Sequence, residues 1–167
     1  MDMVGIHINI HGARARAVQA PEAKAKQEAT AKYFRRETRD VPIEVQVDQC
    51  GEHKMMAVLI NGTDESITGI TTIPSNFIPD TVKEHTDVFM GMCAIGRWEG
   101  EKSRRRIRRI KDTGLIGIED LNRAGQHFHS NDTRFYPLWE EAQELDLIIP
   151  FHTGYVAADF GGKGEAA

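Results

Sequence analysis

The first candidate for chemistry is a histidine in the N-terminal segment 4–11. Apolar residues at positions 4, 6, 8 and 10 alternate there with small or polar ones, namely Gly5, His7, Asn9 and His11. Alternation with a period of two is typical of a β-strand and places each set on its own face. A half-exposed strand with its polar residues outward explains the pattern equally well. His11 stands four residues of extended chain from His7, roughly 13 Å away, so it could join that residue only if the chain turns back sharply.

A second histidine, His152, follows the apolar segment 147–151 and precedes Thr153 and Gly154. A neutral imidazole is a borderline-soft donor that binds zinc at about 2.0–2.1 Å. Taken alone, a histidine at the end of a strand is more often structural than a metal ligand.

Two further groups could contribute to a site. Glu119 and Asp120 follow the apolar segment 115–118, and strand geometry lets only one of them point inward. We expect a solvated loop role for this pair. His127 and His129 stand two residues apart and could form a second metal pair or contact a substrate, although ordinary loop histidines are the simpler expectation.

The arginine-rich segment 104–111 is the strongest positive charge run in a chain whose net charge is −4. Its two isoleucines, Ile107 and Ile110, predict an amphipathic helix that rests on a core with its arginines in water. Since no nucleic-acid-binding motif accompanies the run, we expect no nucleic-acid partner. No apolar segment has the roughly 18–20 residues that cross a bilayer, so no membrane partner is expected.

Short apolar segments alternate with helical ones along the chain. The apolar segments are 4–10, 55–60, 88–95, 115–118 and 147–151. From the second onward they begin about 30 residues apart, which is the size of a βαβ unit. Helices are predicted near 21–37, 43–54, 75–85, 100–113 and 131–145, and residues 11–54 form a longer excursion. The pattern predicts an α/β fold with about five β/α units and parallel strands. An open doubly wound sheet and part of a barrel remain alternatives, and length alone favours the open sheet.

Two cysteines, Cys50 and Cys93, match no zinc or redox spacing and are expected to be reduced, buried thiols of a cytoplasmic protein. The composition fits one domain over residues 1–167, and residues 160–167 are small and polar enough to be a disordered tail.

Several motifs resemble the amidohydrolase-related family of metal-dependent hydrolases and nonoxidative decarboxylases. The most specific is Asp132-Thr-Arg-Phe-Tyr-Pro-Leu138, which leads to the strand that ends in Phe151-His-Thr-Gly154. The segments Gly114-Leu-Ile-Gly-Ile118 and Gln126-His-Phe128 fit the same pattern. This resemblance implies a partial (β/α)₈ TIM barrel that stops after strand 5.

The resemblance also implies a divalent metal, expected to be zinc, at the carboxyl ends of the strands. His7 and His152 match the family's ligand positions, and Asn9 stands as a weak third where the family has a second histidine. The acid that precedes the family's first histidine is Gly5 here, and strands 6–8 with their remaining ligands are missing. The catalytic residues stay unassigned.

Two functions therefore remain open. The chain could be an enzyme that acts on a small organic acid or cyclic substrate. It could instead be a non-catalytic fragment or one half of a split barrel with a degenerate metal site, because an incomplete barrel leaves sheet edges uncovered. Such a chain is expected to form homo-oligomers or to pair with a second chain that completes the barrel.

Overall fold

Four parallel strands form the centre of the computed structural model of the chain. The structure describes residues 3–9, 13–35, 37, 41–61, 73–119 and 128–151. The strands are β1 (Met3–Asn9), β2 (Met55–Ile60), β3 (Phe89–Ala94) and β4 (Gly117–Glu119). They pair in the order β1-β2-β3-β4, each parallel to its neighbour. The predicted α/β class with parallel strands is confirmed.

The fifth apolar segment adds to the β4 side of the sheet through a single parallel bridge between Gly117 and Ile148. Ile118 N donates to Ile148 O at 2.9 Å, and Ile148 N donates to Ile116 O at 3.0 Å. A methyl group on Gly117 would collide with the carbonyl of Ile148. The glycine therefore allows the two backbones to approach.

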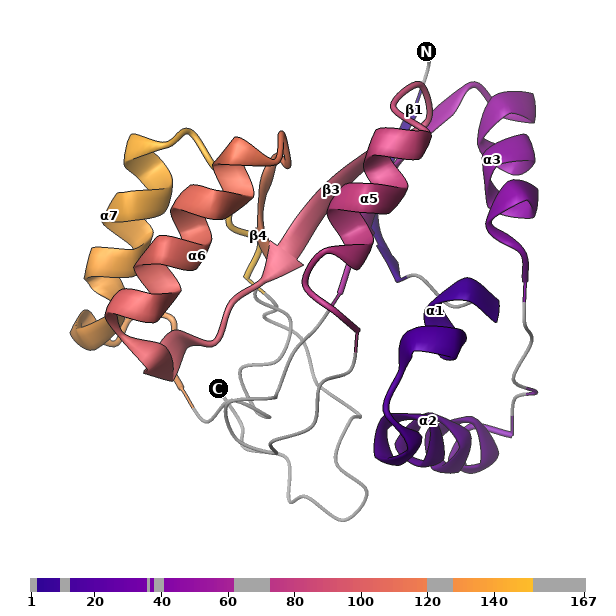
Figure 1. Cartoon of the computed structure of the whole chain (residues 1–167), viewed down its shortest axis with the longest axis horizontal. Helices are drawn as coiled ribbons and strands as arrows, with labels where there is room; N and C mark the ends of the chain where they lie inside the picture. Colours follow the sequence, from indigo (N-terminus) through magenta and orange to yellow (C-terminus); the bar gives the residue numbers. More distant parts are fainter. Residues whose placement is uncertain are drawn as a thin grey trace.

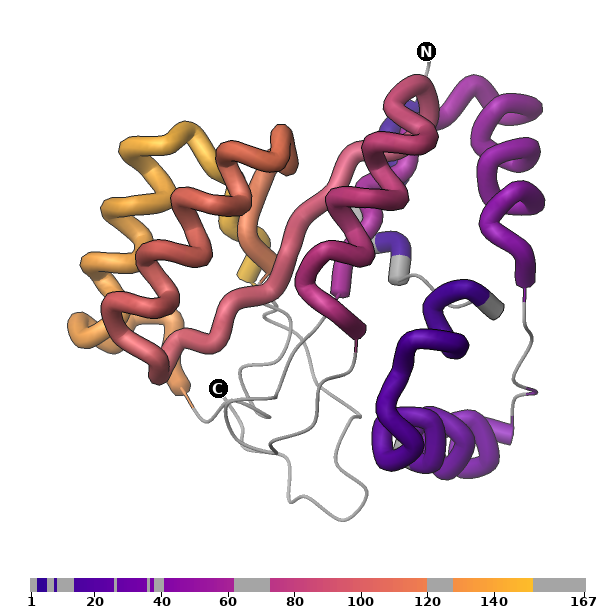
Figure 2. Tube along the Cα trace, viewed as in Figure 1, coloured from indigo at the N-terminus to yellow at the C-terminus, as the bar shows by residue number. Residues whose placement is uncertain are grey.

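Helices connect consecutive strands and cover the sheet (Figure 1). They are α1 (Ala13–Val18), α2 (Pro21–Tyr33), α3 (Ile43–Glu52), α5 (Phe77–Glu84), α6 (Glu101–Asp112) and α7 (Tyr136–Glu144). Two 3₁₀ turns, η1 (Arg97–Glu99) and η2 (Thr133–Phe135), precede α6 and α7. Helix α3 contacts β2, α5 contacts β3 and β2, and α6 contacts β4 and α7. In Figure 2 the trace runs from the N-terminal helices on one side to the α6–α7 pair on the other.

The two faces of the sheet bury different clusters. The helix-covered face holds the main core, which includes Leu59, Cys93 and Ile118. The opposite face carries a small cluster of Val58, Ile60 and Met92. Successive strands add in sequence order with no reversal, whereas a doubly wound sheet requires a reversal that places helices on both faces. The doubly wound alternative is therefore wrong, and the arrangement is that of consecutive units of a (β/α)₈ barrel.

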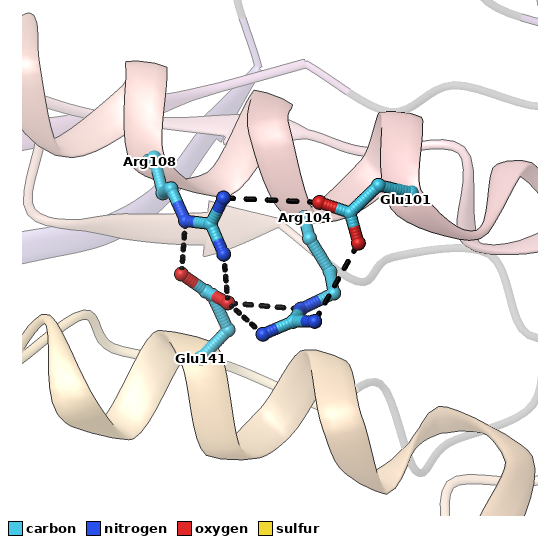
Figure 3. A network of polar contacts seen from close by, with 4 residues as sticks. All are labelled: Glu101, Arg104, Arg108 and Glu141. Atoms are coloured by element: carbon cyan, nitrogen blue, oxygen red, sulfur yellow. Dashed lines mark hydrogen bonds and ion pairs between the residues drawn. The ribbon is translucent and has the colours of Figure 1, made fainter.

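A polar network fixes α6 against α7. Glu141 of α7 is buried and accepts hydrogen bonds from Arg104 Nε at 2.9 Å and Arg108 Nε at 2.6 Å. Both arginines also lie within ion-pair distance of Glu101 (Figure 3). The prediction that the arginines of this helix only meet water is wrong for these two, since a neighbouring helix supplies their carboxylate.

Several predicted elements shift in the structure. The fourth strand is Gly117–Glu119 rather than 115–118, and residues 147–151 form isolated bridges instead of a continuous strand. The predicted unbroken alternation over 4–10 is interrupted, because the register to β2 shifts between Gly5 and Ile8. Helix α1 was not predicted within the 11–54 excursion. The other helices and the buried pair Ile107 and Ile110 are confirmed.

Candidate functional site

Polar side chains lie at or just past the carboxyl ends of three neighbouring strands. Asn61 follows β2, Arg97 begins the turn after β3, and Glu119 ends β4. All three are buried, with 8%, 2% and 1% of their surface exposed. Because the strands are parallel, their carboxyl ends meet at one edge of the sheet, where barrel enzymes place their chemistry. This edge is the candidate site.

Glu119 lies on the face of the sheet that the helices leave uncovered. β3 and β4 pair with Met92 opposite Gly117 and Ala94 opposite Glu119. Met92 belongs to the small cluster on that face, so Glu119 lies on the same face as Met92. A buried carboxyl at a strand end can exchange protons with a reacting group or donate an oxygen ligand to a hard divalent cation. The expected solvated role is therefore wrong for Glu119, and Asp120 lies outside the described residues.

Arg97 is held by aromatic rings rather than by solvent. Its guanidinium carbon lies 4.2 Å from the ring centroid of Phe128 and 5.8 Å from that of Trp139. Phe135 packs edge-to-face on Phe128, with ring centroids 5.5 Å apart, and lies against Trp139 at 6.3 Å. Such cation–π contacts strengthen where water is excluded. They fix a permanent positive charge beside the carboxyl ends of β3 and β4.

The loop that precedes α7 supplies Phe128 and α7 itself supplies Trp139. Local hydrogen bonds hold the shape of this loop. Asp132 accepts from Arg134 N at 3.0 Å, which caps η2. Hydrogen bonding from Arg134 lowers the pKa of the Asp132 carboxyl to about 2. Trp139 Nε1 donates to Ser130 O at 3.3 Å. The motif 132–138 therefore contributes Phe135, which packs against both of the rings that contact Arg97.

Asn61 belongs to the opposite, helix-covered face of the sheet. Leu59 pairs with Gly91, so Asn61 lies level with Cys93, two residues further along each strand. Its Oδ1 accepts from Ala94 N at 3.3 Å and ties the ends of β2 and β3 together. Asn61 and Cys93 line a cleft of about 440 Å³ between α5 and α6. Burial raises the pKa of the Cys93 thiol to about 12, so this thiol stays protonated.

The predicted ligands fall only partly within the described residues. His7 and Asn9 lie in β1 as predicted, and Asn9 pairs with Ile60 at the carboxyl edge. The structure does not describe their side chains. His152, His11 and His127 lie outside the described residues. His129 is exposed.

The described residues do not by themselves make a metal site. Within them, no group of three His, Cys, Asp or Glu side chains converges in a way that could hold a metal ion. Glu119 offers one carboxylate, whereas a catalytic zinc takes three protein ligands. A metal site at this edge would therefore need ligands from side chains that the structure does not describe.

Sequence reasoning missed Arg97 and Asn61. Both stand directly after an apolar segment, Asn61 after 55–60 and Arg97 after 88–95 and Gly96. A rule that inspects the first polar residue after each strand would have found them. Their burial could not have been predicted, because it depends on Phe128, Trp139 and Ala94, which approach only in the folded chain.

Comparison with known proteins identifies the family. The family described as Amidohydrolase matches residues 5–167. None of the curated proteins matches the chain in sequence. Within the described residues, no helix combines the length and apolar character that a membrane crossing demands.

Solved structures share the fold at low sequence identity. One is the 5-carboxyvanillate decarboxylase of Sphingomonas paucimobilis, with a TM-score of 0.63 and 13% identity over 91% of this chain and 52% of that chain. A second is the 5-carboxyvanillate decarboxylase of Novosphingobium aromaticivorans, solved with bound manganese, with a TM-score of 0.61 and 14% identity over 91% and 51%. A third is a probable 2-pyrone-4,6-dicarboxylic acid hydrolase of Acinetobacter baumannii, with a TM-score of 0.57 and 12% identity over 89% and 48%. The chain thus spans about half the length of these proteins, as a partial (β/α)₈ barrel does.

Proposed function

Because the chain belongs to the amidohydrolase family, we propose that it forms part of a metal-dependent hydrolase or decarboxylase that acts on a small organic acid or cyclic compound. Similar structures include both decarboxylases and a probable hydrolase.

One observation carries the proposal: the carboxyl ends of four parallel strands meet at one edge, and Glu119 is buried there on the uncovered face. The same edge receives Asn9 at the end of β1, and Ile148 runs parallel to β4 with its bridge to Gly117, two residues before Glu119. His7 and His152 flank these two positions in the sequence. Barrel enzymes assemble their sites from such strand ends.

We assign His7 and His152 as metal ligands, with Asn9 as a weaker oxygen donor. A bound divalent cation, zinc in our proposal, would polarise an oxygen of the substrate or activate water. Glu119 would hold or release a proton at its carboxyl oxygens. Arg97 would keep a positive charge near the edge, which favours an organic acid over a neutral or cationic compound.

Metal binding in solution tests this assignment. The full chain would be incubated with Zn²⁺ or with Mn²⁺, passed through a desalting column and assayed for metal. We expect close to one ion per chain, and a loss of most of it in His7→Ala and His152→Ala. His129→Ala is the matched control, because His129 is an exposed loop histidine. Less than about a tenth of an equivalent in the unaltered chain would contradict the assignment.

A second candidate is a non-catalytic half-barrel that pairs with another chain or with its own copies. Two observations favour it. The chain covers about half of its structural neighbours. Apolar residues are also exposed at both edges of the sheet, namely Met3 and Val4 on β1, and Ile148 and Phe151 beside β4. A stable complex that lacks bound metal would support this candidate over the enzyme.

We also propose a cytoplasmic location. Cys50 and Cys93 are both buried and unpaired with each other. Free thiols of this kind are usual in a reducing compartment.

A further inference from the structure

Helix α6 presents two separate rows of basic residues. Its buried stripe consists of Ser103, Ile107 and Ile110. One row, Arg104 and Arg108, faces α7 and is bound by Glu141 and Glu101 (Figure 3). The other row lies on the opposite side of the stripe and lines the cleft between α6 and α5, and consists of Lys102, Arg105, Arg106 and Arg109. The spacing of three and four residues places all four on one side of the helix.

Within the described ranges, the second row has fewer carboxylate partners than the first. No acidic side chain lines the cleft among the described residues. Glu99, at the edge of the helix, accepts from Lys102 Nζ at 2.6 Å and lies 3.9 Å from Arg106 Nη1. No carboxylate of the described ranges pairs with Arg105 or Arg109. Counting the described residues alone, the second row thus places four cations beside one carboxylate, whereas the arginines that face α7 are paired.

The other walls of the cleft offer neutral polar groups and an apolar floor. Asn61, Ser75 and Thr113 line it with Cys93, Ala94 and Pro79. Asn61 Oδ1 is held by Ala94 N, and no described residue engages its Nδ2 donor. Hydroxyl and amide donors next to guanidinium groups are the usual surroundings of a bound oxyanion.

The size of the cleft selects among anions. Its volume of about 440 Å³ lies in the range of small-ligand sites. Nucleic acid would need an extended basic surface, and this chain carries a net charge of −4. A compact molecule with two or more phosphate or carboxylate groups would satisfy several of the four cations at once.

We propose that the cleft between α5 and α6, lined by Lys102, Arg105, Arg106 and Arg109, binds a small polyvalent oxyanion. It is a different site from the candidate active site: Asn61 and Cys93 place it on the helix-covered face, whereas Glu119 lies on the opposite face. Binding there needs no divalent metal. The oxyanion site can therefore be tested independently of the proposed function.

Calorimetric titration of the full chain in chelator-treated buffer tests the proposal. The probes are pyrophosphate and citrate, at about 0.1 M ionic strength, where exposed charges are screened beyond roughly 10 Å. We expect saturable binding of at least one probe. The double variant Arg105→Ala/Arg109→Ala should weaken it by about tenfold or more, because each guanidinium supplies a charge-assisted pair. Lys111→Ala is the matched control, since Lys111 is exposed on α6 and does not line the cleft.

A second double variant tests whether charge alone is enough for binding. Arg105→Lys/Arg109→Lys keeps the charge and should retain part of the affinity, with a greater loss for pyrophosphate if guanidinium pairing matters. Circular dichroism verifies that each variant is folded. Equal binding by the unaltered chain and the double alanine variant would overturn the proposal, as would no saturable binding of either probe. Tighter binding of single-stranded DNA than of both probes, with a steep salt dependence, would also overturn it in favour of a polymer.

Discussion

At the scale of single residues, Glu141 shows how the fold uses a buried carboxylate. Hydrogen bonding from Arg108, and then from Arg104, lowers the pKa of this carboxyl below its ordinary value of 4.5. A depressed folded-state pKa means that the unfolded chain binds more protons in acid. The stabilisation that Glu141 gains from these two arginines is complete above the pKa of the unfolded state. It is lost as the pH falls through the pKa of the folded state.

We predict that Glu141→Gln lowers the midpoint of thermal unfolding by a few degrees at pH 7. Removing the charge leaves Arg104 and Arg108 with Glu101 as their remaining carboxylate. The difference from the unaltered chain should shrink as the pH falls below the ordinary value of 4.5 and through the lowered folded-state pKa, because the native carboxylate then becomes protonated as well.

Thermal melts from pH 7 to pH 3 measure this effect. Glu140→Gln is the matched control, because Glu140 is the exposed neighbour on α7. A deficit for Glu141→Gln that persists unchanged at pH 3 would show that the loss is steric rather than electrostatic.

At the scale of elements, Gly91 determines how closely α5 packs on β3. An added methyl group would lie 2.7 Å from Ile78 Cγ2 and 2.9 Å from both Leu115 Cδ2 and Val82 Cγ2. Ile78 and Val82 belong to α5, so the helix rests directly on the glycine. These neighbours are branched side chains in a packed core and have little room to move.

We predict that Gly91→Ala lowers the free energy of unfolding by about 1–3 kcal/mol through overpacking. Gly51→Ala provides the opposite control: nothing lies within 4 Å of the added carbon, and Gly51 is inside α3. That change should stabilise the chain by about 0.5–1 kcal/mol, since glycine is unfavourable within a helix. Urea unfolding of the two variants measures both effects, and a neutral Gly91→Ala would refute the close approach of α5.

The elements that could be predicted are those whose periodicity is strong. The segment 55–60 predicts β2 to the residue because apolar residues fill a strand buried on both faces. Ile107 and Ile110 predict the buried stripe of α6 for a similar reason. Helix α1, by contrast, alternates alanine and arginine before Val18, and it buries Ala15. Its sequence therefore has no apolar stripe that would predict a helix.

At the scale of the whole molecule, the sheet exposes apolar residues at both of its edges. On β1, Met3 and Val4 are 59% and 48% exposed, and beside β4, Ile148 and Phe151 are 53% and 38% exposed. Strand edges of this kind pair readily with other strands. We therefore predict that the chain associates in a concentration-dependent manner.

Light scattering coupled to size-exclusion chromatography measures this association. Val4→Lys should reduce it, because a charge on an edge strand opposes pairing. Val45→Lys is the matched control, since Val45 is an exposed apolar residue of helix α3 and not of a strand. If the unaltered chain is a monomer at all concentrations, the edges of the sheet do not drive association.

The candidate site was predictable only where residue type and strand position coincide. His7 and Asn9 lie in β1 at the predicted strand, whereas the burial of Glu119 and Arg97 depends on contacts between segments far apart in the chain. Resemblance to the family supplied the barrel, because length alone favoured an open sheet.

The most direct measurement is a crystal structure of the chain grown with zinc, with anomalous diffraction recorded at the zinc edge. We expect one strong peak at the carboxyl edge of the sheet, within about 2.0–2.1 Å of an imidazole nitrogen from each of His7 and His152. No peak at that edge, or two imidazoles that face opposite sides of the sheet, would contradict it.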